Sequence, residues 1–225
     1  MVNLTGPRYV SGLSVIFIGV IAKVGVLDFG VGNITSIINA LGAVGANPIR
    51  ATTPDLVAKS THLVLPGVGA FSSGMRRLRE SGLTESLLSH VNSLNRPILG
   101  ICLGMQMLTN VSYEFGSYAG LGLIRGHVEK LPNEAPVLDL PHIGWSEVTY
   151  APNMTLFSGI DQLSDFYFLH SFHVSVEQNC RIATARHGIN FVAALEVDNI
   201  FGTQFHPEKS QTNGLRLLKN FVNAG

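Results

Sequence analysis

Hydrophobic and polar positions follow two different patterns along this chain, and the pattern changes near residue 140. In the first part, short apolar runs end at glycine or proline, and segments with apolar residues at helical spacing follow them. The apolar runs predict buried strands over residues 23–30, 47–52, 61–69 and 96–101. The segments between them predict helices over residues 33–45, 72–82 and 83–94, and a further helix beginning at Leu103. This alternation predicts parallel βαβ units in a doubly wound sheet.

The second part of the chain is rich in strand patterns. These predict strands over residues 142–150, 166–176 and 181–205. Two dipeptides typical of tight hairpin turns interrupt the last range, His187-Gly188 and Asp198-Asn199. We therefore expect an α/β fold in one domain, with a central, mostly parallel sheet flanked by helices and a β-rich C-terminal half.

The helical segments also predict which side chains face the core. In the helix over 72–82 the basic residues should face solvent, and Thr84 should cap the next helix. A final helix over 212–224 places Leu215, Leu218 and the Phe221-Val222 pair on one apolar face.

Composition narrows the class of protein. The 225 residues suit one domain, and no repeat or linker divides them. Lys and Arg total 15 and so do Asp and Glu, so the basic excess of a nucleic-acid-binding protein is absent. The two cysteines are too few for a disulfide framework, which favours the cytoplasm. The scattered histidines lack the spacing of metal ligands, so no metal is expected.

Residues 1–23 form an N-terminal extension of uncertain status. Ser11 to Ala22 is apolar over about the length of a signal-peptide core, and Arg8 precedes it. The run is shorter than the roughly 20 residues that span a bilayer, and no small-residue cleavage site follows it. Secretion, an additional N-terminal strand and a start codon placed too early all stay open.

Cys102 lies in a sequence that favours a reactive thiol. Gly100-Ile101-Cys102-Leu103-Gly104 has the form G-x-C-x-G at a predicted strand-to-helix turn, the thiol version of a nucleophile elbow. Glycines permit the sharp turn, and the positive end of the new helix favours the thiolate. A lone cysteine in an apolar run is more often structural, so this alternative stays open until a base is found.

The candidate base is His206. A predicted strand ends at Phe205, and Pro207 then fixes the backbone between His206 and Glu208 so that both side chains can point at one site. His206 would accept the thiol proton and Glu208 would orient the imidazole. The amide of Leu103, with Val68 or Gly69 of the loop over 66–69, would form an oxyanion hole. A surface turn and a plain loop are the alternatives.

Together these motifs resemble a known family. "GICLGMQ" and "QFHPEKS" resemble the class I (triad) glutamine amidotransferases, and "LPGVGAF", "PHIGWSEV" and "FYFLHSF" resemble the glutaminase subunit of imidazole glycerol phosphate synthase. The resemblance covers Val24 to the C-terminus, so residues 24–225 would form a glutamine amidotransferase domain of flavodoxin-like fold. It implies hydrolysis of L-glutamine through a cysteinyl thioester, without a cofactor.

The resemblance also implies partners. Ammonia would pass to a HisF-like cyclase subunit, a (βα)₈ barrel that forms a heterodimer with this chain. That subunit would make imidazole glycerol phosphate and AICAR in histidine biosynthesis. Neither nucleic acid nor membrane would be bound.

The same resemblance implies catalytic, substrate-binding and partner-binding roles for individual residues. Cys102, His206 and Glu208 match the triad, and Gly67 to Gly69 the oxyanion strand. The positions matching substrate contacts are Gly67, Gln106, His170, Ser171 and Phe172. Those matching the surface for the cyclase are Asn33, Ile143, Trp145 and Ser146. Trp145 as a core residue, His170 as a satisfied buried histidine and Gln106 as a solvated residue are the alternatives.

Some positions depart from the family. Relatives generally carry Asn where Ser146 stands, often Met where Ile143 stands, and frequently Tyr where Phe29 stands. Acidic residues usually follow the elbow helix, where this chain has "TNVSYEFGS". We expect these departures to affect the partner surface. A glutaminase serving a surface-sugar amidotransferase is therefore an alternative, as is a non-catalytic binding or regulatory module. Cysteine peptidases and γ-glutamyl hydrolases share the elbow and need no partner.

Overall fold

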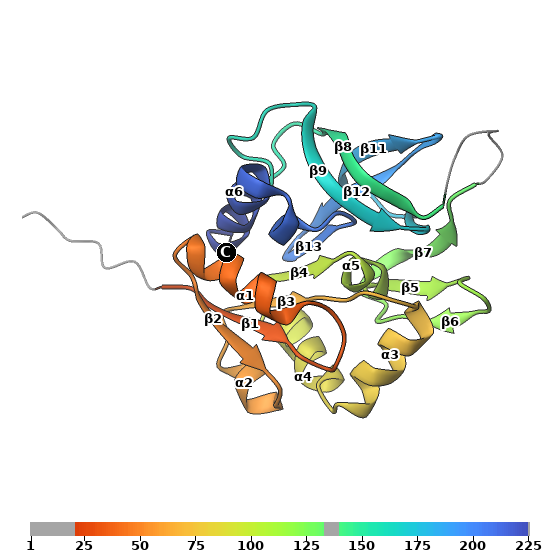
Figure 1. Ribbon diagram of the computed structural model, residues 1–225. Helices are drawn as coiled ribbons and strands as arrows, with labels where there is room; N and C mark the ends of the chain where they lie inside the picture. Colours follow the sequence, from red (N-terminus) through yellow and green to blue (C-terminus); the bar gives the residue numbers. More distant parts are fainter. Residues whose placement is uncertain (1–20, 133–139, 225) are drawn as a thin grey trace, which may run out of the picture.

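A nine-stranded sheet organises the molecule in the order β2-β1-β3-β4-β13-β12-β11-β8-β9 (Figure 1). The computed structural model describes residues 21–132 and 140–224. In sheet order the strands are β2 (Asn47–Ala51), β1 (Lys23–Leu27), β3 (His62–Leu65), β4 (Ile98–Ile101), β13 (Ile200–Thr203), β12 (Ile189–Val197), β11 (Arg181–His187), β8 (His142–Tyr150) and β9 (Ser164–His170). The expected α/β fold with a β-rich C-terminal half is confirmed.

Parallel pairing is confined to one side of this sheet. The strands from β2 to β13 pair in parallel, whereas those from β13 to β9 pair antiparallel. The sheet is thus mixed rather than mostly parallel. The reason is local, because β11, β12 and β13 are joined by the two predicted tight turns, and a tight turn can only reverse the strand direction.

A second, four-stranded sheet was not expected. Its order is β10 (Phe172–Val176), β7 (Ile124–Lys130), β5 (Thr109–Ser112) and β6 (Tyr118–Ala119). It begins where the predicted helix after the cysteine stops, since α5 (Leu103–Met107) has only five residues. The carbonyls of Met107 and Leu108 accept hydrogen bonds from residues 121, 123 and 124 instead of continuing the helix.

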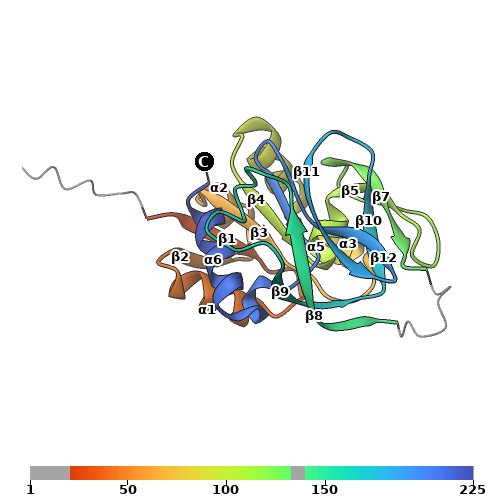
Figure 2. The same cartoon turned by 90° about the horizontal axis from the view of Figure 1, so that it is seen from above.

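Helices cover both faces of the large sheet. The core on one face includes α1 (Ile34–Ala43) and α6 (Gln211–Val222), which lie side by side in Figure 2. The core on the other face includes α2 (Pro54–Ala58), α3 (Phe71–Glu80), α4 (Thr84–Leu88) continuing into a π-helical turn over Ser89–Ser93, and α5. In β3, Val64 points to the first core while Leu63 and Leu65 point to the second, as strand alternation requires.

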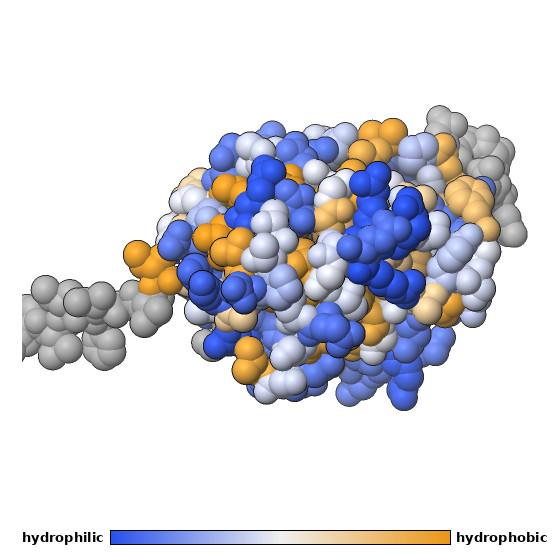
Figure 3. Space-filling view, turned by 90° about the horizontal axis from the view of Figure 1, so that it is seen from below, coloured by the Kyte–Doolittle hydropathy of each residue, from blue (hydrophilic) through white to orange (hydrophobic). Residues whose placement is uncertain are grey.

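Two helical details were predicted wrongly. Thr84 does not cap α4, because it is already helical and its hydroxyl donates to the Leu78 carbonyl at 3.3 Å. Leu215 is 37% exposed, and Leu217 takes its place on the buried face of α6. The basic residues of α3 are exposed as predicted, and hydrophilic residues gather over this helix in the view from below (Figure 3).

The predicted N-terminal extension lies mostly outside the described residues, which begin at residue 21. Within residues 21–132 and 140–224, no helix is long and apolar enough to cross a membrane.

Candidate active site

Cys102 and His206 come together because β4 and β13 are neighbouring parallel strands. Ile101 pairs with Thr203, and the Cys102 amide donates to the Thr203 carbonyl at 2.7 Å. Parallel neighbours present their carboxyl ends at the same edge of a sheet, so the residues that follow them share one site. Two motifs far apart in the sequence are thereby joined.

The backbone at Cys102 has the conformation of a nucleophile elbow. Its φ of +53° and ψ of −110° are strained for a residue with a side chain. A Cβ on Gly104 would collide with the Leu65 carbonyl oxygen, and one on Gly100 would come within 2.7 Å of the Met105 nitrogen. Only glycine lets α5 press this closely on β3 and β4. The elbow predicted from the sequence is therefore present.

His206 and Glu208 form a buried ion pair. Nδ1 of His206 lies 2.8 Å from Oε1 of Glu208, and their side chains are 3% and 2% exposed. A turn of 3₁₀ helix over Pro207–Lys209 sets this geometry. The alternative of a plain surface turn is thus wrong.

The thiol and the carboxylate together change the charge of this histidine. Burial alone would lower the pKa of the His206 imidazole, but Cys102 and Glu208 raise it to about 10. Cys102 is the larger of the two influences that raise this pKa, although within the described residues Nε2 of His206 makes no hydrogen bond of normal geometry. The arrangement favours an imidazolium beside the sulfur.

Gln204 is a contact of the sulfur that the sequence did not reveal. It is fully buried, and its Nε2 lies 3.7 Å from Sγ of Cys102. The Leu169 carbonyl lies at the same distance from that sulfur. A polar residue inside an apolar run two positions before His206 was the available signal.

A cleft of about 320 Å³ opens beside the sulfur. The sequence-predicted residues that line it are Val68, Gly69, Cys102, Leu103, Gln106, His170, Ser171 and Phe172. His206, Glu208 and Gly67 instead line a smaller hollow behind it. The structure thus places the thiol at the boundary between the cleft and its candidate base.

Gln106 and His170 both bind the Phe172 carbonyl. Gln106 is 5% exposed and donates from Nε2 at 2.9 Å, so the alternative of a solvated residue is wrong. Nδ1 of His170 lies 2.9 Å from the same oxygen. Burial lowers the pKa of His170 to about 3, so it is a satisfied buried histidine as well as a cleft residue.

The loop over 66–69 packs against the elbow. A Cβ on Gly67 would come within 2.9 Å of the Leu103 side chain, so glycine permits this contact. Leu103 is the first residue of α5, where backbone N–H groups lack partners within the helix. Val68 is 44% exposed and Gly69 has a φ of +99°. The loop is placed to bring a second amide to the cleft.

Glu114 supplies a carboxylate that we did not expect. It lies in "TNVSYEFGS", lines the cleft, and accepts a hydrogen bond from the Phe71 amide at 2.6 Å. This amide begins α3, whose positive end suits an anion. The segment that departs from the family in sequence therefore still brings an acidic group to the cleft.

The residues assigned to a partner surface are largely exposed. Ile143 and Trp145 are 59% and 46% exposed on the same side of β8, so the alternative of Trp145 as a core residue is wrong. Ser146 is half-buried, and Asn33 is exposed at the start of α1, where it caps Ser36. Phe29 is only 6% exposed, which excludes it from this surface.

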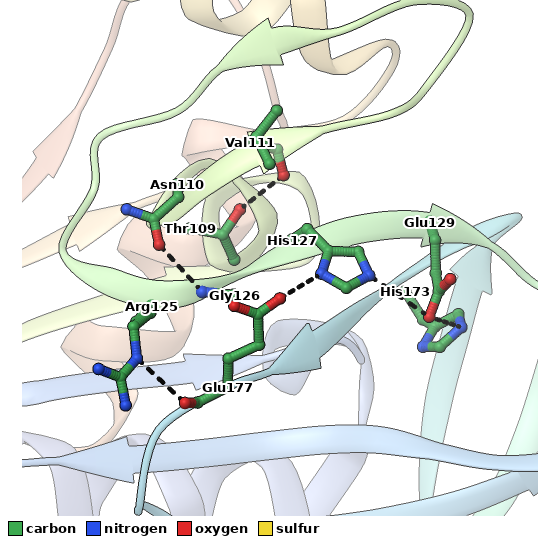
Figure 4. Close-up of polar contacts among 9 residues, drawn as sticks. All are labelled: Thr109, Asn110, Val111, Arg125, Gly126, His127, Glu129, His173 and Glu177. Atoms are coloured by element: carbon green, nitrogen blue, oxygen red, sulfur yellow. Dashed lines mark hydrogen bonds and ion pairs between the residues drawn. The ribbon is translucent and has the colours of Figure 1, made fainter.

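A second cluster of titratable groups lies on the smaller sheet (Figure 4). Nδ1 of His127 is 2.9 Å from Glu177, and one oxygen of Glu129 is 3.8 Å from Nε2 of both His127 and His173. These ion pairs link β7 to β10 and to the residue that follows it. In the part of the chain that the structure describes, no group of three or more such residues could hold a metal ion.

Comparisons with known proteins agree with this geometry. The model of the glutamine amidotransferase class-I family matches residues 25–224. Imidazole glycerol phosphate synthase subunit HisH 1 of Campylobacter jejuni is 44% identical over 199 residues, covering 88% of this chain and 98% of that protein. Subunit HisH of Geobacter metallireducens is 41% identical over 206 residues, covering 89% and 98%.

Solved structures share the fold. A glutamine amidotransferase superposes with a TM-score of 0.70 at 18% identity, covering 89% of this chain and 99% of the other. PurLQS of Thermotoga maritima superposes with a TM-score of 0.64 at 17% identity, covering 91% and 99%.

Proposed function

This chain belongs to the class I glutamine amidotransferases, and we propose that it uses Cys102, His206 and Glu208 to hydrolyse L-glutamine. It is the glutaminase subunit of an imidazole glycerol phosphate synthase, in histidine biosynthesis. The observation that carries the triad is His206, which is buried against Glu208 and held charged by Glu208 and Cys102.

The first half of the reaction forms a thioester. The Cys102 thiolate attacks the γ-carbonyl carbon of glutamine, and the resulting oxyanion is held by the amides of Leu103 and the loop over 66–69. The His206 imidazolium gives its proton to the amide nitrogen, the C–N bond breaks, and ammonia leaves. Glu208 keeps the imidazole ring in the orientation for this transfer.

The second half releases glutamate. His206, now neutral, takes a proton from a water molecule that attacks the thioester carbon. The C–S bond breaks, and the thiolate and imidazolium are restored. Each turnover thus converts one glutamine and one water into one glutamate and one ammonia, without a cofactor.

The cleft has groups that suit the amino-acid end of glutamine. Glu114 would pair with the α-ammonium group, since it is the acidic residue that lines the cleft. Gln106, Gly67 and the segment of His170, Ser171 and Phe172 would hold the rest of the substrate.

The ammonia serves a cyclase subunit. We propose that this partner is a (βα)₈ barrel, forms a heterodimer with the chain, and docks on the surface of Asn33, Ile143, Trp145 and Ser146. The exposed aromatic and aliphatic side chains of β8 support this choice. We also propose that residues 24–225 form one amidotransferase domain preceded by an extension, and that the complex works in the cytoplasm.

The test is glutamate release by the purified chain, alone and with the cyclase subunit and its ribulosyl ligand. We expect strong stimulation by partner and ligand, because the loop over 66–69 must place its amide in the oxyanion hole. Cys102→Ala is the control for contaminating glutaminases. Absence of glutamate in both states would contradict the proposal, and stimulation by a surface-sugar amidotransferase instead would reassign the partner.

A further inference from the structure

We propose that Ser146 is a positioning residue, which orders the catalytic cleft through a chain of hydrogen bonds that connects strand β8 to the Cys102 sulfur. The proposal rests on the proposed function for its effect on catalysis, whereas the hydrogen-bond chain itself is a property of the fold.

The outer half of the hydrogen-bond chain leads from Ser146 to the Phe172 carbonyl through two buried histidines. Oγ of Ser146 lies 2.9 Å from Nε2 of His142, and Nδ1 of His142 lies 3.2 Å from Nε2 of His170. Nδ1 of His170 then reaches the Phe172 carbonyl at 2.9 Å. His142 and His170 are only 4% and 6% exposed, so water does not compete for these bonds.

The inner half reaches the nucleophile through two glutamines. The Phe172 carbonyl also accepts from Nε2 of Gln106 at 2.9 Å, and the same nitrogen donates to Oε1 of Gln204 at 3.1 Å. Nε2 of Gln204 in turn lies 3.7 Å from the Cys102 sulfur. The Phe172 carbonyl is thus the point where the two halves meet.

The outer half has only one possible direction. A carbonyl oxygen only accepts, so Nδ1 of His170 must carry a hydrogen. Burial lowers the pKa of His170 to about 3 and, together with His187, that of His142 to about 4, so both rings are neutral at pH 7. Nε2 of His170 is therefore an acceptor, Nδ1 of His142 is the donor, and the hydroxyl of Ser146 must donate to His142.

Packing holds the first ring in place. His142 is stacked between His187 and Phe168, with ring centroids at 4.3 and 5.0 Å and interplanar angles of 21° and 23°. A ring fixed on both faces does not turn over easily to exchange its nitrogens. Loss of the Ser146 donor would therefore leave Nε2 of His142 unsatisfied and weaken the whole chain.

The hydrogen-bond chain begins beside the proposed partner surface, so a bound partner can influence it. Ser146 is half-buried on β8, next to the exposed Trp145. A partner group that donates to the Ser146 oxygen leaves its proton directed at His142. A partner group that accepts this proton removes the donor on which the outer half depends. A contact at β8 therefore acts on the cleft without touching it.

The experiment compares three variants of the full chain in complex with its cyclase subunit. Ser146→Ala removes the donor, Ser146→Thr keeps it, and Thr149→Ala is the matched control. Thr149 lies on the same strand, and within residues 21–132 and 140–224 its hydroxyl bonds only that of Thr184, at 3.0 Å. We expect kcat for glutamine hydrolysis to fall about fivefold in Ser146→Ala, with KM little changed, as one lost hydrogen bond implies. Ser146→Thr and Thr149→Ala should keep the wild-type kcat.

Nitrogen-15 chemical shifts of the imidazoles provide the second readout. In the wild type, His142 and His170 should both carry hydrogen on Nδ1, and Ser146→Ala should shift the resonance of the unprotonated Nε2 of His142, because this nitrogen loses its hydrogen bond. Unchanged shifts and kcat in Ser146→Ala, or an equal loss in Thr149→Ala, would overturn the proposal. If even the wild type hydrolyses no glutamine, the proposed function fails alone. The proposal is then judged by these shifts and by the rate at which iodoacetamide alkylates Cys102, which need no glutamine.

Discussion

Two sites in this protein hold equally buried histidines that differ in charge, since His206 is positively charged whereas His142 and His170 are neutral. His206 is 3% exposed and its pKa is raised to about 10, while His142 and His170 are 4% and 6% exposed with pKa values lowered to about 4 and about 3. Burial is nearly the same, so it does not decide the charge. The neighbours do, since His206 faces a carboxylate and a thiol, whereas the other two face uncharged hydrogen-bond partners and aromatic rings.

Removing the sulfur of Cys102 should have the largest effect on the site around the charged His206. We expect Cys102→Ala to lower glutamine hydrolysis by about 10⁴-fold or more, because no thioester can form. Glutamate release by the complex measures this loss, and thermal melting serves as the control for folding. A variant that still turns over at a measurable fraction of the wild-type rate would rule out Cys102 as nucleophile.

Removing the base comes next in size. His206→Asn should slow thioester formation by about 10³-fold, since a positioned acid and base contribute roughly that much. Rapid quenching of a single turnover with labelled glutamine measures the acylated enzyme directly. Acylation at a near-normal rate would show that another group takes the proton.

Glu208→Gln should lower the pKa of His206 and so make this histidine more like the neutral His142 and His170. It removes one of the two groups that raise the pKa of His206, so the imidazolium should lose its proton at a lower pH than in the wild type. We expect acylation to fall by about 10²-fold at neutral pH. The pH profile of acylation is the measurement, and a profile that coincides with that of the wild type would contradict this role of Glu208.

The neutral histidines, His142 and His170, should make the free energy of unfolding fall at acidic pH. The unfolded chain binds protons at these histidines near pH 6.5, whereas the folded chain binds them only near pH 4 and pH 3. Their effect on stability is therefore absent above pH 6.5, and the folded state loses stability progressively as the pH falls from 6.5 towards the folded values. Each costs about 2 kcal/mol by pH 5.

His142→Phe is the variant that tests this loss. It removes one titrating ring, so the free energy of unfolding should change less steeply between pH 6.5 and 4, as urea titrations measure it. The substitution also removes the His142 hydrogen bonds, which lowers stability at every pH and leaves the comparison of slopes intact. An unchanged slope would mean that His142 does not contribute to acid lability.

The ion pairs on the smaller sheet should give the smallest effect. Glu177 is 57% exposed and Glu129 is 47% exposed, so water screens both carboxylates from His127. We expect Glu177→Gln to change the free energy of unfolding by less than about 1 kcal/mol at pH 7. A loss as large as that of a buried pair would show that this cluster resembles the triad more than its exposure suggests.

The sequence predicted those features of the structure that depend on residues close to one another along the chain. The strands of the parallel half, the two hairpin turns and the elbow all follow from local periodicity and glycine placement. The second sheet did not, because α5 ends where distant residues 121–124 take its carbonyls. Gln204 and His142 were missed for the same reason, since their roles come from side chains that only the fold brings within reach.

The position of β13 has a consequence for protein synthesis. This strand follows every other described strand along the chain, yet it lies in the middle of the sheet, between β4 and β12. A nascent chain that has emerged only as far as β12 carries Cys102 without His206 or Glu208. Glutamine hydrolysis by the proposed triad can therefore begin only after β13 and the turn that follows it have been synthesised, and a protease that cuts between β12 and His206 would separate the thiol from its proposed base.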